Sequence, residues 1–207
     1  MRLNFATFAD YSSRGQGPES LKSRKLCDGI KAGNERALTS LAKALSSERA
    51  EPIRDFLAAD RTLVPIPGSG KTTPENFWGP RLICEALAHE GIGAGVLPLL
   101  IRNTGVPKSA FAAAGERPTP QRHFESIKAE IDLTTPRRIT LVDDVVTKGS
   151  TAIGAARRIR HELPDCDIKL FAVFRTCNFA QDIERCINPR SGNLTYADTS
   201  DAVRRID

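Results

Sequence analysis

Hydrophobic residues recur through much of the first sixty positions at the three- and four-residue spacing of amphipathic helices. The clearest stripe consists of Leu38, Leu41 and Leu45. Such stripes predict helices over residues 19–32, around residues 38–45 and over residues 52–59. No chemical motif accompanies these helices. We therefore predict that residues 1–60 form a helical extension or cap that packs on the rest of the chain.

From residue 61 the pattern changes to short apolar runs that alternate with helical segments. The predicted strands cover residues 63–67, 96–101, 139–142 and 168–174. Helices are expected over residues 80–90, around Phe124, Ile127 and Ile131, and over residues 150–163. This alternation predicts an α/β fold for residues 61–207, with a doubly wound, mostly parallel sheet. Such sheets bind ligands at the carboxyl ends of their strands.

Composition narrows the class of protein. The chain has 207 residues, of which 40% are hydrophobic, and this is enough for one domain with a sizeable core. No apolar run approaches the roughly 18 residues of a membrane span, so no membrane partner is expected. The formal net charge of +5 suits an anionic partner. Dense Lys/Arg blocks are missing, which disfavours nucleic acid without excluding it.

Cysteine and histidine positions disfavour several kinds of site. The five cysteines stand at positions 27, 84, 166, 177 and 186, an odd number with no C-x-x-C pair. This spacing disfavours a zinc ribbon and a disulfide framework. The three histidines form no H-E-x-x-H motif, so a metalloprotease has no support. Free thiols and the lack of an apolar export signal predict a cytoplasmic protein.

The loop after the first predicted strand has the sequence Gly68-Ser69-Gly70-Lys71-Thr72, which resembles the end of a P-loop. In a P-loop NTPase, backbone N–H groups and the lysine hold the nucleotide phosphates. Here Pro65, which has no N–H, stands where the first glycine belongs. Pro74 also prevents a regular helix from continuing beyond Lys71-Thr72. A P-loop NTPase therefore remains the third alternative.

The richest segment joins two acids to a hydroxyl-rich loop. Asp143 and Asp144 end the apolar run of residues 139–142, and Thr147-Lys148-Gly149-Ser150-Thr151 leads into the next helix. Carboxylates accept hydrogen bonds from neighbouring hydroxyls of a ligand. Hydroxyls, a cation and N–H groups at a helix N-terminus suit a phosphate, and a glycine lets the backbone approach it. Together these groups describe a site for a sugar phosphate.

This segment resembles the phosphoribosyl-pyrophosphate motif of type I phosphoribosyltransferases. Four apolar residues, two acids, two apolar residues and a T-x-G-x-T loop follow one another between Arg137 and Thr151. The wider resemblance covers about residues 60–176 and is closest to the orphan and ComF-like branch. It includes V-P-x-P at residues 64–67 and a weaker R-x-T-P-x-Q-like stretch at residues 117–121. The zinc-binding N-terminal segment common in that branch is absent, and Lys148 stands where many members have Thr.

The resemblance implies roles for individual residues. Asp143 and Asp144 would bind the ribose hydroxyls, directly or near Mg²⁺. The 5′-phosphate would be held by Thr147, Lys148, Gly149, Ser150 and Thr151. The pyrophosphate would lie against Pro67, Gly68, Ser69, Gly70 and Lys71. Residues 102–121 would form a flexible loop over the site, with Arg102, Lys108 and Arg117 as candidate pyrophosphate contacts. His123 is assigned to the same flexible loop as Lys108 and Arg117. His123 would be a proton donor, a contact to the nucleobase or simply a polar helix cap.

The resemblance therefore predicts a Mg²⁺-dependent phosphoribosyltransferase. It would use phosphoribosyl pyrophosphate and displace pyrophosphate at C1 by a nitrogen acceptor, which the sequence does not identify. The alternative is a regulator or effector that binds phosphoribosyl pyrophosphate or a nucleotide without turnover, as in bacterial defence or competence. The N-terminal helices offer a surface for a homo-oligomer or a protein partner.

Overall fold

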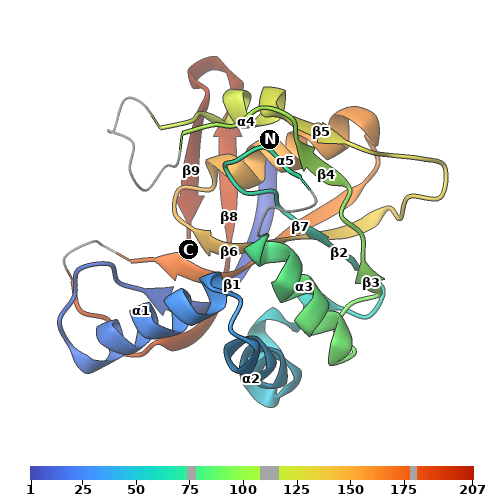
Figure 1. Cartoon of the computed structure of the whole chain (residues 1–207). Helices are drawn as coiled ribbons and strands as arrows, with labels where there is room; N and C mark the ends of the chain where they lie inside the picture. The colour runs from blue at the N-terminus through green and yellow to red at the C-terminus, as the bar shows by residue number, and fades with distance from the viewer. Residues whose placement is uncertain (74–77, 108–116, 178–180) are drawn as a thin grey trace.

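The computed structural model describes residues 1–73, 78–107, 117–177 and 181–207, and it is built around one large sheet (Figure 1). The strands of this sheet are β1 (Arg2–Tyr11), β2 (Thr62–Pro65), β3 (Gly95–Val96), β6 (Arg138–Val146), β7 (Asp167–Thr176), β8 (Ile187–Ala197) and β9 (Ala202–Ile206). Their order is β3-β2-β6-β7-β1-β8-β9. The pairs from β3 to β1 are parallel, and β8 and β9 add an antiparallel ribbon. A separate antiparallel pair consists of β4 (Leu100–Arg102) and β5 (Ile127–Ala129).

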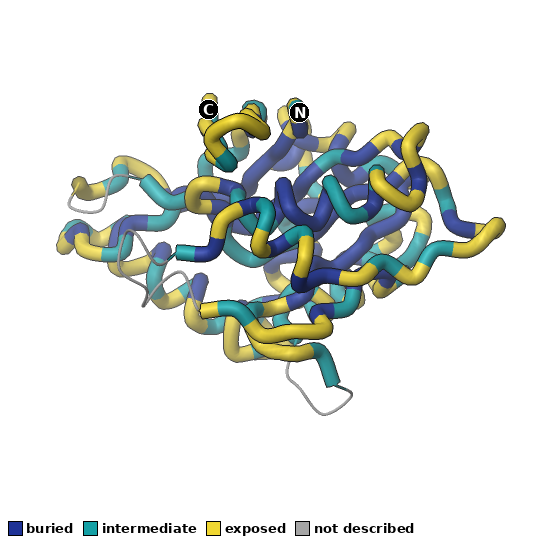
Figure 2. Tube along the Cα trace, turned by 90° about the horizontal axis from the view of Figure 1, so that it is seen from above, coloured by how far each residue is buried: buried dark blue, intermediate teal, exposed yellow. Residues whose placement is uncertain are grey.

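Helices cover both faces of the sheet, which confirms the predicted α/β class. The helices are α1 (Pro18–Lys31), α2 (Glu35–Ser46), α3 (Gly79–His89), α4 (Pro120–Ser126) and α5 (Ser150–Glu162), with 3₁₀ turns η1 (Glu48–Leu57) and η2 (Asp198–Ser200). On one face, α1, α2, η1 and α3 enclose a core with Val142 and Phe171. On the other face, α5 packs its Ile153 and Ile159 on Leu141 and Leu170. Buried segments accordingly fill the middle of the molecule between exposed outer turns (Figure 2).

The first sixty residues contain a central strand, so the prediction that they are a purely helical extension is wrong. Strand β1 pairs in parallel with β7 and antiparallel with β8, with Phe5 opposite Leu170 and Gly192. Its residues become buried because neighbours on both sides and helices on one face enclose it. The expected helices are confirmed as α1, α2 and η1. Residues 1–60 are therefore part of the sheet as well as a cover for it.

Three further elements differ from the sequence prediction. The apolar run 96–101 is divided between β3 and β4, because Pro98 interrupts the chain between them. Ile127 does not continue a helix, since α4 ends at Ser126 and the chain becomes extended as β5. Strand β6 continues through Asp143 and Asp144 to Val146, beyond the expected end, because it stays paired with β7. The tail forms the ribbon of β8 and β9.

Arg61 links the amino-terminal ends of β2, β6 and β7 by hydrogen bonds. Its side chain is fully buried. The guanidinium donates to Thr140 Oγ1 at 2.9 Å and to the carbonyl oxygens of Ile139 at 2.5 Å and Asp167 at 2.9 Å. It also pairs with the Asp167 carboxylate at 2.6 Å. These bonds satisfy a buried cation that would otherwise be costly, and they join β2 to β6 and β7.

Candidate functional site

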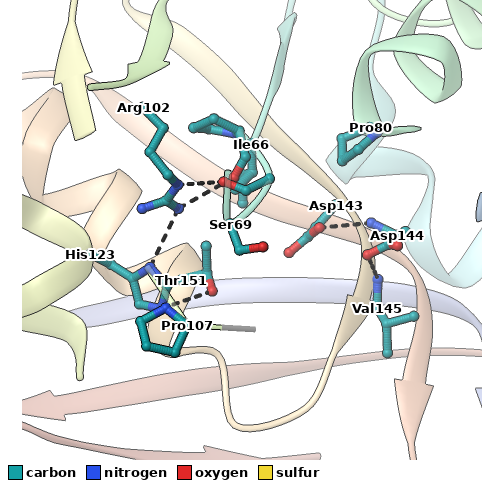
Figure 3. Close-up of a pocket in the computed structure, with 12 residues that line it drawn as sticks. Ile66, Ser69, Pro80, Arg102, Pro107, His123, Asp143, Asp144, Val145 and Thr151 are labelled. Carbon is teal, nitrogen blue, oxygen red and sulfur yellow. Dashed lines mark hydrogen bonds between the residues drawn. The ribbon is translucent and has the colours of Figure 1, made fainter. Parts of the chain in front are cut away.

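A cavity of about 260 Å³ lies at the carboxyl ends of β2 and β6, beside the start of α5 (Figure 3). Its lining residues are Ile66, Pro67, Gly68, Ser69, Pro80, Arg102, Pro107, His123, Asp143, Asp144, Val145 and Thr151. Parallel strands point their carboxyl ends to this edge, so segments distant in sequence meet here. The cavity thus brings together the two predicted acids, part of the loop after β2 and the first turn of α5.

Asp143 and Asp144 lie within β6 and diverge, because successive strand side chains point to opposite faces. Asp143 points toward Ser69, whereas Asp144 lies on the side of Val145 (Figure 3). The Asp143 carboxylate accepts the backbone N–H of Asp144 at 2.9 Å. Burial raises the pKa of Asp143 well above its usual range, and the neighbouring Asp144 raises it further. A ligand with hydroxyl donors or a cation would relieve this unfavourable charge.

Lys31, which the sequence analysis did not select, reaches the second acid from the last turn of α1. Its Nζ lies 4.0 Å from Asp144 Oδ2 and 6.0 Å from the centre of the Tyr11 ring. Burial lowers the pKa of Lys31, but Asp144, Cys27 and Tyr11 together outweigh burial, and the net pKa is raised. No local motif marks this lysine, because its position depends on how α1 packs beside β6.

The loop before α5 packs closely against β8 at Gly149. Gly149 has a positive φ of 89°, and a Cβ there would lie 2.4 Å from Leu194 Cδ1. Thr151 lines the cavity, whereas Thr147 and Lys148 are exposed on the loop and Ser150 begins the helix. Arg205 of β9 donates to the carbonyl oxygens of Thr147 at 2.8 Å and Thr176 at 2.9 Å. These bonds tie the loop before α5 and the end of β7 to β9. The N–H groups of the first turn of a helix suit an anion.

Arg102 anchors the loop after β2. Its buried guanidinium donates to the Gly68 carbonyl, to the Pro67 carbonyl at 3.3 Å and to Ser126 Oγ at 2.6 Å. Burial lowers the pKa of Arg102 to about 10, although Asp143 partly offsets this. The prediction that Arg102 belongs to a flexible loop is wrong, because it lies in β4, and its guanidinium still lines the cavity.

The structure also contradicts the P-loop alternative. Residues 71–73 have no helical structure, and the helix that follows them, α3, begins at Gly79. A P-loop requires the helix to begin beside its lysine, so that helix N–H groups meet the phosphates. Lys71 is exposed on the loop, and the next residue is held to β4 by a bond of 2.9 Å from Thr72 N to Arg102 O.

The assignment of His123 to the flexible loop is wrong, because it lies in α4 and is buried against the cavity. Its Nδ1 is 3.4 Å from Arg102 Nη2, and its Nε2 is 3.2 Å from Thr151 Oγ1. Burial, with Arg102 and Arg122, lowers the pKa of His123 to about 4. The imidazole is therefore neutral at pH 7. The helix cap is Thr119, whose side chain accepts the Arg122 N–H at 3.3 Å.

The remaining predicted contacts are only partly described. Arg117 is half-buried, and its Nε has no hydrogen-bond partner among the described residues. Lys108 lies outside the described residues, as does most of the predicted loop over the site. No group of three or more His, Cys, Asp or Glu side chains in the described ranges is arranged to hold a metal by itself. Within the same ranges, no helix is long and apolar enough to cross a membrane.

Comparisons with known proteins give a similarity in structure and none in sequence. No protein-family model matches the chain, and no curated protein matches it in sequence. Among solved structures, a hypoxanthine phosphoribosyltransferase from Staphylococcus aureus is similar, with 14% identity and a TM-score of 0.34. The match covers 72% of this chain and 68% of that chain. At this identity and score it says nothing about the substrate, which must be argued from the site.

Proposed function

We propose that this protein binds phosphoribosyl pyrophosphate in the cavity at the ends of β2 and β6 and transfers its phosphoribosyl group to a nitrogen acceptor. One observation carries the proposal. The half-buried Asp143 shares one cavity with Thr151 at the start of α5 and with the loop at residues 67–69. Hydroxyl acceptors beside an anion site fit a sugar that carries a phosphate.

The ligand's parts correspond to different segments of the site. Asp143 and Asp144 would accept hydrogen bonds from the ribose hydroxyls. The N–H groups of the first turn of α5 and the Thr151 hydroxyl would bind the 5′-phosphate. Backbone groups of the loop at residues 67–70 would meet the pyrophosphate, and Arg102 holds this loop by its carbonyl oxygens. Arg102 therefore contributes to binding through the loop.

In the proposed reaction, the acceptor nitrogen forms a bond to C1 of the ribose while the C1–O bond to pyrophosphate breaks. Positive charge develops on the ribose, and the bonding electrons leave with pyrophosphate. No protein nucleophile is required. Positioning of the two reactants and electrostatic stabilisation by Asp143 and Asp144 supply the catalysis.

The donor set also suits Mg²⁺, which commonly takes one or two carboxylates and completes its shell with water and substrate phosphates. Asp143 and Asp144 would supply the carboxylates, and burial makes Asp143 a carboxyl group that a nearby cation would stabilise in its ionised form. When bound, the ion would neutralise charge on the departing pyrophosphate.

A second candidate is a protein that binds phosphoribosyl pyrophosphate without turning it over. One observation favours it: the guanidinium of Arg102 already donates to Pro67, Gly68 and Ser126, so fewer of its N–H groups remain for a departing pyrophosphate. Release of pyrophosphate in the presence of a panel of nucleobases separates the two candidates. Binding without release for any acceptor would favour the regulator.

The direct test is isothermal titration of phosphoribosyl pyrophosphate with and without Mg²⁺. We expect binding by the wild-type protein and at least a tenfold loss in the double variant Asp143→Asn/Asp144→Asn, because both hydroxyl acceptors lose their charge. Asp165→Asn, an exposed acid on the loop after α5, is the matched control. Unchanged affinity in the double variant would show that the acids do not bind this ligand.

A further inference from the structure

Arg102, His123 and Thr151 form a chain of polar contacts that ends in the cavity (Figure 3). Arg102 is fully buried and His123 is 3% exposed. Arg102 Nη2 lies 3.4 Å from His123 Nδ1, and His123 Nε2 lies 3.2 Å from Thr151 Oγ1. The three residues come from β4, α4 and α5, so the chain joins three elements at the wall of one cavity.

Ser126 holds the first two members of this chain in place. Its hydroxyl accepts from Arg102 Nη1 at 2.6 Å and donates to the carbonyl oxygen of His123 at 3.1 Å. The guanidinium is also fixed by the carbonyl oxygens of Pro67 and Gly68. Neither Arg102 nor the backbone of His123 therefore has freedom to reorient.

The chemistry of the three side chains fixes which atom donates in each of these hydrogen bonds. A guanidinium can only donate, so the Nδ1 of His123 must accept. The neutral imidazole then carries its hydrogen on Nε2 and donates it to Thr151 Oγ1. Because this oxygen accepts from His123, its own hydrogen must point elsewhere, and Thr151 lines the cavity.

We propose that His123 is a positioning residue that turns the Thr151 hydroxyl into a hydrogen-bond donor aimed at a phosphate group in the cavity. The inference rests on the proposed function, because the phosphate belongs to the phosphoribosyl ligand. His123 acts on the ligand through Thr151. The Thr151 hydroxyl then donates its hydrogen into the cavity, which suits the acceptor oxygens of a phosphate.

The first test needs no ligand. Nitrogen-15 NMR of the imidazole groups reports which ring nitrogen carries the hydrogen, and the loss of one set of signals in His123→Gln assigns them. We expect the neutral Nε2–H form of His123, unchanged between pH 7 and about pH 5.5, because burial and then Arg102 and Arg122 oppose a second proton. An Nδ1–H form or a charged imidazole over that range would overturn the proposal.

The second test titrates ribose 5-phosphate and phosphoribosyl pyrophosphate into matched variants. Asn at position 123 reaches the place of Nδ1 but not that of Nε2, so His123→Asn loses the contact to Thr151. We expect about tenfold weaker binding. His123→Gln places an amide N–H near the position of Nε2 and should recover most of the loss. His89→Asn, at an exposed position in the last turn of α3, is the control.

The effect of His123→Asn on affinity must act through the Thr151 hydroxyl. Thr151→Val should weaken binding at least as much as His123→Asn, and the double variant should be no weaker than Thr151→Val alone. Additive losses, or an unchanged affinity in His123→Asn, would overturn the positioning role while the proposed function stands. A wild-type protein that binds neither ligand would overturn the proposed function, and this inference would fall with it.

Discussion

Asp143 occupies a half-buried strand position that lines the cavity. Its pKa is raised in the folded protein, so folded molecules bind a proton more tightly than unfolded ones do. Stability therefore decreases as pH rises from the ordinary Asp range through the folded pKa. We predict that Asp143→Asn increases the free energy of unfolding at pH 7, because it removes a charge that burial disfavours in the folded protein. Urea denaturation at pH 7 and pH 4 measures this, and the gain should shrink at pH 4.

His123 gives the opposite dependence on pH. Its folded pKa of about 4 lies below its ordinary value of 6.5, so its contribution is complete above pH 6.5 and is lost as pH falls toward 4. The shift corresponds to about 3 kcal/mol. The difference in unfolding free energy between wild type and His123→Gln isolates this contribution from that of Asp143. A difference that stays constant between pH 7 and pH 4 would contradict it.

The residue roles show where sequence reasoning reached its limit. Asp143 and Thr151 were predicted because their chemistry is local, within one strand, loop and helix. Arg102 lines the cavity, but its place in β4 was not predicted, because the direction of its side chain depends on β4 lying beside the loop at Pro67. Lys31 and Arg205 were not predicted at all. They lie far from the motif in sequence, and only the packing of α1 and β9 brings them near it.

At the scale of elements, the fit between α4 and α5 controls the position of His123. A Cβ on Gly154 of α5 would lie 2.4 Å from His123 Cβ and 2.9 Å from Phe124 N. We predict that Gly154→Ala costs about 2 kcal/mol of stability, since overpacking outweighs the gain in helix propensity. It should also weaken binding of phosphoribosyl pyrophosphate, because α4 must shift away from Thr151.

Gly29 provides the matched control for that substitution. It lies inside α1, and its nearest contact for an added Cβ is Ala37 Cβ at 3.4 Å, which is ordinary packing. Gly29→Ala should be neutral or stabilise by up to about 1 kcal/mol. Thermal and urea denaturation of the two variants compare them directly. Equal effects would mean that the close approach of α4 to α5 is not what limits position 154.

The elements themselves were predictable where their pattern was local. Helix α5 and strands β6 and β7 follow from periodicity and length, and the structure confirms them. The sequence of β1 also contains alternating apolar residues, yet helical patterns dominate the sixty residues around it. Its place between β7 and β8 depends on pairing across more than 160 residues, and no local signal describes such pairing.

For the whole molecule, the central place of β1 means that the first sixty residues cannot be removed without dividing the sheet. Their loss would separate β7 from β8 and expose the core that α1, α2 and η1 cover. We predict that a chain of residues 61–207 does not unfold cooperatively in urea and binds hydrophobic dyes. A cooperative transition in that chain, at the urea midpoint of the full protein, would mean that residues 61–207 fold independently.

A point variant tests the same idea in the intact chain. Phe5 lies in the middle of β1 and is 1% exposed. Phe5→Ala should cost about 3–5 kcal/mol, the usual loss for a large core side chain. Leu21 on α1 is 51% exposed, so Leu21→Ala should change stability by less than about 0.5 kcal/mol. Because β1 pairs directly with β7, whose neighbour β6 carries Asp143, Phe5→Ala should lower stability and ligand binding together. Loss of stability with unchanged affinity for phosphoribosyl pyrophosphate would instead mean that the site forms independently of β1.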